Sequence, residues 1–422
     1  MYDNHLKKRY FLFCCLLLSL IGIFWLVALI TRGATINMYF VPDSTDTSMD
    51  YFNMLANIPG LDPYAQNANY PALPFLIWRI FYRMIPSYPQ GNDGHFLRGT
   101  MEAQLGYILC LIICFILLWE LVKHTVKLDK FYPALLAISL VLSGPILFTI
   151  ERGNIIFLSF LFSFLFILMF DASQKGIRYC AYFCLAIAAA IKIYPAVLGL
   201  LVVVKKRYKE AVALMVLGIL CFIIPFFVFD GLESLKTMLY GISLSSAESI
   251  QQGFGCNFSF GNLVRLFYAC MGVYKEQITS FTYIMPIIIC ISVFLLSKEL
   301  WKKVFSLILF MVWMPAFSYT YTLIFFILPL VIFLAQNKNK FDYLYTILFA
   351  FILAPWAFPK VDFINNVADF DFKFFTSYGM LIINFSIFIF SLLLIIDGII
   401  HIYERKRNDY KYTQKYCTAK KI

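Results

Sequence analysis

The chain has 422 residues, of which 61% are apolar and only 14% are charged, and its mean hydropathy is +0.78. This composition excludes an ordinary soluble domain and indicates an all-α polytopic membrane protein. The net charge of +11 would suggest nucleic acid in a soluble protein, but here the basic residues cluster in short segments between apolar runs. Such clusters are typical of loops retained in the cytoplasm, so we expect no nucleic-acid partner.

The first predicted element is the apolar run 11–30, which is long enough to cross a bilayer. No small-residue cleavage site follows a short hydrophobic region, so we interpret this run as a retained helix rather than a cleaved signal. The basic residues Lys7, Lys8 and Arg9 precede it and predict a cytoplasmic N-terminus.

An acidic loop, 33–100, follows and is expected on the extracytoplasmic side. It opens with Asp43, Asp46, Asp50 and Asp62. Asp46 and Asp50 are four residues apart, so in a helix their carboxylates share one face. Two acids so placed can have separated pKa values, which leaves one of them ionised as a base. The alternative is a capping and turn cluster in a solvated loop, because Asp, Asn, Pro and Gly favour turns.

Further apolar runs occupy the rest of the chain, and we expect them to be helical because backbone groups in lipid must be paired internally. Their ranges are 101–122, 132–150, 155–170, 179–204, 212–229, 283–296, 304–317, 323–334, 343–356 and 380–400.

The run 179–204 has basic residues on both flanks, including Lys175 and Lys205. A single crossing would leave one basic cluster outside, whereas a hairpin that turns at Lys192 to Pro195 keeps both in the cytoplasm. Counting this short-helix hairpin as two crossings predicts a bundle of about twelve transmembrane helices.

This topology places both termini in the cytoplasm and makes the protein a multi-pass component of the cytoplasmic membrane. We expect one integral membrane domain, 1–404, and a basic cytoplasmic tail, 405–422. Besides the first loop, the segments 230–280 and 359–377 are expected outside. Asp362, Asp369 and Asp371 in the last of these either form a solvated face or shape an acceptor site.

Three strings in the first loop carry a resemblance to a known family. They are DTSMDYFN at 46–53, GLDPY at 60–64 and YPALP at 70–74. In this order they resemble the first loop of glycosyltransferase family 87, which comprises polytopic C-type glycosyltransferases that use polyprenyl-phosphate sugars. The last string has Tyr-Pro-Ala-Leu-Pro, with two separated prolines, in place of the family's double proline.

Other matching pieces follow in the family's order. Glu-Arg-Gly-Asn at 151–154 resembles its polar Gly-Asn element, and Lys-Ile-Tyr-Pro at 192–195 resembles its Lys-x-x-Pro hairpin. Asn-Phe-Ser at 257–259 is similar to its Asn-x-Ser, and 314–321 is similar to its Ser-Pro-x-Ser-Trp-x-His element. The resemblance therefore spans 46–329, most of the chain.

The resemblance implies a C-type (GT-C) bundle with an extracytoplasmic catalytic loop that transfers a hexose, with mannose as the suggested sugar. The donor would be a polyprenyl-phosphate sugar and the acceptor a hydroxyl of a lipid or glycan, in contact with membrane lipids. No metal or other cofactor is implied.

The implied chemistry needs a general base and cations for the leaving phosphate. We assign the base to Asp46, with Asp50 as the second choice, and the phosphate site to Arg152 and Lys192. For Arg152 the alternative is an interfacial anchor, and for Lys192 a buried ion pair, because a cation at that depth is costly unless it is paired or hydrated. Further candidates are Asn154, Asn257, Tyr321 and His95.

Two other functions share this topology. A transporter or flippase of polysaccharide or lipid-linked sugar would normally place charges or broken helices near the midplane of several segments. Here the charges concentrate in the predicted outer loops, with Lys192 as the chief exception. A glycan polymerase or ligase would also act outside on lipid-linked sugars.

Overall fold

The computed structural model describes residues 2–41, 44–58, 63–66, 68–86, 93–251, 257–271, 281–336, 340–356 and 378–419. These parts form helices and connecting turns, with one isolated antiparallel bridge between Asn257 and Tyr319 and no strand. Asp43, Asp62 and the segment 359–377 lie outside the described residues.

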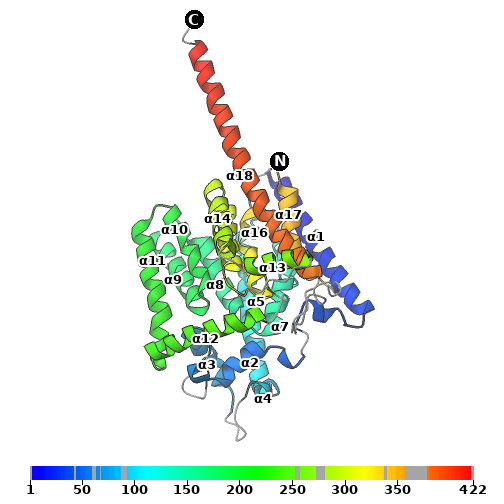
Figure 1. The fold of residues 1–422 in the computed structure, drawn as a ribbon, viewed down its shortest axis with the longest axis vertical. Helices are drawn as coiled ribbons and strands as arrows, with labels where there is room; N and C mark the ends of the chain where they lie inside the picture. Colours follow the sequence, from blue (N-terminus) through cyan, green and yellow to red (C-terminus); the bar gives the residue numbers. More distant parts are fainter. Residues whose placement is uncertain are drawn as a thin grey trace.

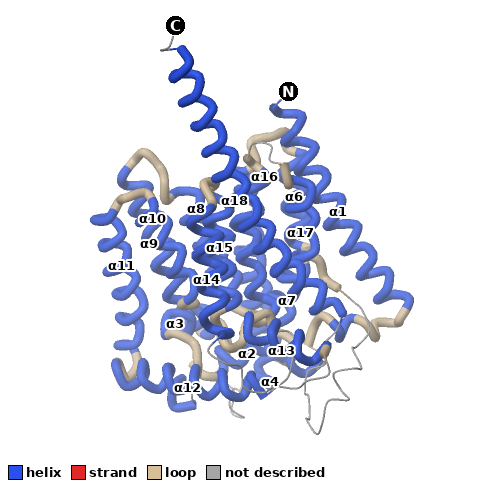
Figure 2. The backbone as a smooth tube through the Cα atoms, turned by 45° about the horizontal axis from the view of Figure 1, so that its top comes forward, coloured by secondary structure: helices blue, strands red, loops and turns tan. Residues whose placement is uncertain are grey.

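The helices pack into one bundle, and the N-terminus and the C-terminal helix emerge at the same end (Figures 1 and 2). We call this the termini end. The long helices of the bundle are α1 (Tyr2–Ile30), α5 (Met101–Thr125), α11 (Tyr208–Ile223) and α18 (Tyr378–Ala419). The bundle also contains α6 (Phe131–Val141), α7 (Gly144–Arg152), α8 (Ile156–Met169), α9 (Lys175–Ile191), α10 (Leu200–Val204), α13 (Phe260–Cys270), α14 (Phe281–Leu296), α15 (Leu300–Trp313), α16 (Ile327–Leu334) and α17 (Asp342–Leu353).

The opposite end of the bundle, the loop end, carries short helices (Figure 1). They are α2 (Met49–Ala56), α3 (Ala72–Tyr82), α4 (Gly94–Arg98) and the longer α12 (Leu232–Gln251). The described parts of the first predicted loop, 33–100, therefore contain the three α-helices α2, α3 and α4.

Among the described residues four helices are long and apolar enough to cross a membrane: Asn4–Ile30, Met101–Thr125, Tyr208–Val228 and Gly379–Arg405. The pair α6 and α7, bent by 52° at Leu142 and Ser143, adds a fifth if it is one broken span. The other apolar helices are shorter than a span, so the count of about twelve crossings stays a prediction.

The segment around Lys192 folds as a hairpin. Helix α9 ends at Ile191, and after a break the 3-10 helix η4 (Tyr194–Gly199) and α10 lead back. At the far end of α10, Lys205 pairs with Asp171, which precedes α9, and Arg207 lies 3.0 Å from the same carboxylate. Both basic flanks therefore lie at one end, as the predicted hairpin requires, whereas its two membrane crossings stay a prediction.

Aromatic packing forms the centre of the bundle. Phe305 of α15 and Phe390 of α18 have ring centroids 4.4 Å apart, and Phe349 of α17 lies 4.7 Å from Phe390. Aromatic pairs of this kind add to the large apolar area that these side chains bury. At the termini end, buried Arg9 pairs with Asp342 and buried Lys302 with Asp397, so these four buried charges are matched.

A second apolar cluster fastens the loop helices to the bundle. Tyr51 of α2 packs edge-to-face on Trp78 of α3 at 4.9 Å, and both rings are buried. Ile191 at the end of α9 and Phe226, which follows α11, belong to the same cluster. The cluster therefore holds α2, which carries Asp50, against the break in the hairpin.

Candidate active site at the loop end

The site begins where α7 ends. Gly153 closes the helix in the left-handed conformation, with φ +67°, which glycine adopts without steric cost. A Cβ atom at this position would lie 2.9 Å from the carbonyl oxygen of Ser48 and 3.0 Å from Tyr51 Cβ. Gly153 therefore permits the close approach of α2 that brings the first loop against Arg152 and Asn154.

Ser48 precedes α2 and is itself left-handed, with φ +59°. Its backbone N–H donates a hydrogen bond to the carbonyl oxygen of Glu151 at 2.6 Å, which fixes the start of α2 on the end of α7. Asp46 lies before this kink, in a 3-10 turn, and Asp50 lies in the first turn of α2. The two acids therefore do not share one helix face, as a continuous helix would have required.

Arg152 nevertheless joins the two carboxylates. Its Nη1 is paired with Asp46 Oδ2, and its Nη2 lies 2.7 Å from Asp50 Oδ1. The exposed fractions of the side chains are 13% for Arg152, 19% for Asp50 and 40% for Asp46. Asp46 is thus the more accessible acid, and the guanidinium is engaged by two carboxylates at once.

Asn154 fixes the second carboxylate. Its Nδ2 donates to Asp50 Oδ2 at 2.6 Å and lies 2.9 Å from the hydroxyl of Tyr70. Its Oδ1 accepts from the N–H of Ile156, the first residue of α8, at 3.0 Å. Both oxygens of Asp50 are therefore occupied, whereas Asp46 Oδ1 has no hydrogen-bond partner among the described residues.

Lys192, at the break in the hairpin, lies beside Tyr70, whose hydroxyl contacts Asn154. Its Nζ lies 3.8 Å from the centre of the Tyr70 ring and 5.7 Å from that of Tyr321. Within the described part of the chain no carboxylate lies at ion-pair distance from it, so aromatic faces supply its closest stabilisation. Burial raises the pKa of Tyr70 well above its usual value, and the nearby Asp50 raises it further, so this phenol stays protonated at neutral pH.

The structure thus brings together two acids, an arginine, an asparagine and a lysine from three segments that are distant in sequence. A family model, described as glycosyltransferase family 87, matches residues 97–334, more than half of the chain. The chain belongs to glycosyltransferase family 87. No curated protein and no solved structure matches it.

The family 87 match includes Arg152, Asn154 and Lys192, whereas Asp46 and Asp50 precede its first residue. Membership confirms the resemblance seen in the sequence and identifies a membrane glycosyltransferase in general terms. The roles of the individual site residues stay predictions.

Asn257 is engaged in a structural clamp. Its Oδ1 accepts from the N–H groups of Ser259 and Ser318, each at 3.0 Å, and the N–H of Phe258 donates to the carbonyl oxygen of Ser318 at 2.8 Å. The clamp ties 257–259 to 316–319, directly before Tyr321. In this family 87 protein Asn257 therefore fastens the segment that carries Tyr321, and it makes no hydrogen bond to the two carboxylates.

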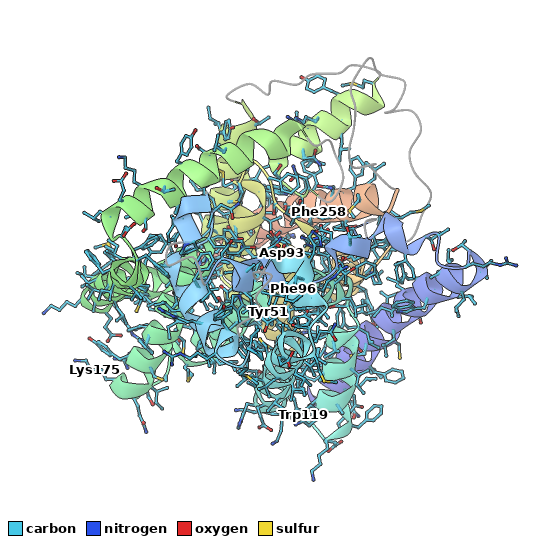
Figure 3. All side chains as sticks on the ribbon, turned by 90° about the horizontal axis from the view of Figure 1, so that it is seen from below. Tyr51, Asp93, Phe96, Trp119, Lys175 and Phe258 are labelled. Carbon is cyan, nitrogen blue, oxygen red and sulfur yellow. The ribbon has the colours of Figure 1, made fainter. Side chains whose placement is uncertain are left out.

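His95 lies on α4, is exposed, and makes no hydrogen bond or ion pair with the described residues. Its neighbour Asp93 caps α4 by accepting from the N–H of Phe96 at 2.7 Å. In Figure 3, which views the bundle from the loop end, Asp93, Phe96 and Tyr51 lie near the middle, while Lys175 and Trp119 lie at the periphery.

Two residues of the site were not among the candidates from sequence. Tyr70 was noted only as part of the YPALP string, and Glu151, beside Arg152, has a buried carboxylate oxygen without a hydrogen-bond partner in the described parts of the chain. No group of three or more His, Cys, Asp or Glu among those residues is placed to hold a metal ion.

Proposed function

We propose that this family 87 glycosyltransferase moves a hexose from a polyprenyl-phosphate sugar to a hydroxyl of a lipid or glycan acceptor at the extracytoplasmic membrane face. The observation that carries the proposal is the pairing of Arg152 with both Asp46 and Asp50. Lys192 lies nearby, against the ring of Tyr70. This arrangement offers an accessible base beside separate cationic groups. Mannose is the donor sugar that the resemblance favours.

Asp46 serves as the general base. Its Oδ1 is uncommitted among the described residues and its side chain is 40% exposed, so an acceptor hydroxyl can reach it. The acceptor oxygen forms a bond to the anomeric carbon while its proton passes to Asp46. The bond between the anomeric carbon and the phosphate oxygen breaks, and its electron pair leaves with the polyprenyl phosphate.

The leaving phosphate gains one negative charge, which cationic groups must stabilise. Lys192 is the cation for this role, because Arg152 is engaged by two carboxylates. As Asp46 takes up the proton, its attraction for Arg152 weakens. The guanidinium then becomes available to the phosphate, which couples proton transfer to departure of the leaving group.

The testing experiment incubates purified protein with a panel of labelled polyprenyl-phosphate sugars and a membrane lipid extract. We expect a covalent glycolipid or glycan product from one donor. Asp46→Asn should lower its rate by about 10²- to 10⁴-fold, the usual contribution of a general base. Asp93→Asn is the matched control, since asparagine caps a helix as well as aspartate does, and it should keep the wild-type rate.

Two results would contradict the proposal. Wild-type turnover by Asp46→Asn would exclude Asp46 as the base. In protein-containing vesicles, movement of the labelled lipid across the bilayer without any covalent product would instead support the transporter.

A further inference from the structure

Three carboxyl groups lie around the guanidinium of Arg152, and only two of them are paired with it. Asp46 and Asp50 take its two terminal nitrogens. The third is the preceding residue, Glu151, whose Oε2 is buried and has no hydrogen-bond partner in the part of the chain that the structure describes. Glu151 thus adds a third acid to the site, but its buried oxygen lacks the contacts that stabilise an anion.

The backbone fixes Glu151 where the first loop meets the end of α7. Its carbonyl oxygen accepts a hydrogen bond from the N–H of Ser48 at 2.6 Å. The hydroxyl of Tyr107, on α5, donates to the carbonyl oxygen of the preceding residue, Ile150. Two other segments therefore close over the end of α7, which accounts for the burial of the Glu151 carboxyl.

The charges around Glu151 are unevenly balanced. The titratable groups that face it among the described residues are Asp46 and Asp50 from the first loop, Arg152 beside it and Tyr107 from α5. One guanidinium and two carboxylates give a net charge of −1, and an ionised Glu151 would make it −2. Loss of water and nearby like charges both disfavour that ionisation.

The carboxyl of Glu151 consequently titrates near neutral pH. Glu151 follows the apolar run 132–150 and lies at the loop end, beside the acids. Burial raises the pKa of its carboxyl to about 7, against the opposing effect of Arg152 and with a further contribution from Asp46 and Asp50. The charge of the site therefore changes within the physiological range of pH.

We propose that Glu151 is a positioning residue that must hold its proton for an anionic donor phosphate to bind beside Arg152. The protonated carboxyl leaves the guanidinium to the two aspartates. The ionised carboxylate competes for that guanidinium and repels the phosphate. Glu151 makes and breaks no bond to the substrate and acts through Arg152. This inference rests on the proposed function for the anionic head group, whereas the proton on Glu151 does not depend on it.

The first test measures the Kd of purified protein for undecaprenyl-phosphate mannose, a phosphodiester whose charge is constant between pH 6 and 7.5. For one proton with a pKa of about 7, the wild-type Kd should rise about fourfold over this range. Glu151→Gln imitates the protonated acid, so its Kd should change by less than about twofold. Glu151→Asp restores a titratable carboxyl and should restore the dependence on pH.

The matched control is Glu233→Gln, which removes an exposed carboxylate of α12 that pairs only with Lys236 among the described residues. Its Kd should follow the wild-type dependence on pH. Equal pH dependence in the wild type and Glu151→Gln would overturn the inference, as would its loss in Glu233→Gln.

The second test needs no ligand. A carboxyl whose pKa rises on folding, here from 4.5 to about 7, stabilises the folded protein below pH 4.5, and this stabilisation is lost as the pH rises to 7. The melting temperature of the wild type should therefore fall between pH 5 and 7.5 relative to that of Glu151→Gln. A difference that stays constant with pH would refute the retained proton.

These outcomes are separable from the proposed transfer. If binding and melting temperature both depend on Glu151 as expected and no donor yields a covalent product, the transfer is refuted and the role of Glu151 is retained.

Discussion

Asn154 donates to Asp50 at 2.6 Å and thereby occupies the one carboxylate oxygen of Asp50 that Arg152 leaves open. Asp50 is held from both sides, whereas Asp46 keeps one oxygen accessible. The two acids thus differ in their surroundings although they share a guanidinium. In the proposed mechanism, Asp50 orients the arginine and Asp46 faces the acceptor.

The first prediction separates the two contacts of Asn154. Asn154→Asp retains an acceptor for the N–H of Ile156 but places a third carboxylate against Asp50, whereas Asn154→Ala loses both contacts. We expect kcat to fall by about tenfold or more in both, since a lost hydrogen bond to a charged group is worth roughly 1.5–3 kcal/mol. Only Asn154→Ala should also lose the turn that begins α8, which its melting temperature would report. Unchanged kcat in Asn154→Asp would contradict the role given to Asp50.

The second prediction concerns Tyr70, whose ring faces Lys192 and whose hydroxyl lies 2.9 Å from Asn154 Nδ2. Tyr70→Phe keeps the ring and should leave the KM for the donor near the wild-type value. Tyr70→Leu removes the cation–π contact, worth about 0.5–2 kcal/mol, and should raise that KM by roughly 2- to 30-fold. Steady-state kinetics of the two variants side by side distinguish the ring from the hydroxyl.

The pH dependence gives an independent check on Tyr70. Burial raises the pKa of this phenol, so it stays protonated as the pH rises through the usual range of tyrosine. The alkaline limb of the activity profile should therefore be the same for the wild type and Tyr70→Phe. A limb that disappears in Tyr70→Phe would show that the phenol titrates.

Much of the fold was predictable because membrane physics leaves few choices. Long apolar runs must be helical, and the proline at 195 between two basic flanks predicted the hairpin that the structure contains. The sequence also placed Asp46, Asp50 and Arg152 among the candidates. The family match covers the later strings, from 151 to 321, whereas the three strings of the first loop precede it.

The contacts of the site were not predictable. Asp46 and Arg152 are 106 residues apart, and Tyr70 and Asn154 are 84 apart, so no periodicity connects them. The left-handed Ser48 breaks the helix that a spacing of four suggested between the acids. Arg152 was expected to hold phosphate, but only the folded loop reveals the two carboxylates that engage it.

The third prediction follows from those two carboxylates. Arg152→Lys keeps the positive charge but replaces the planar fork, which binds two partners, with a single ammonium group. We expect kcat to fall by about tenfold or more, and the melting temperature to fall as well, because one carboxylate loses a charged hydrogen bond worth roughly 1.5–3 kcal/mol. Arg152→Gln should be worse on both measures, since both acids then lack a counter-charge. Near-normal activity of Arg152→Lys would show that the arginine acts as a simple point charge.

The last prediction tests the close approach that assembles the site. Gly153→Ala forces a left-handed alanine, which costs about 1–2 kcal/mol, and places Cβ 2.9 Å from the carbonyl oxygen of Ser48. Since α2 is held at this point, the alanine should displace Asp50 from Arg152 and lower both activity and melting temperature. Gly176→Ala is the matched control, because its Cβ meets nothing within 4 Å and alanine is favoured within helices by about 0.5–1 kcal/mol. If the two variants behave alike, the tight contact between α7 and α2 is not what positions the acids.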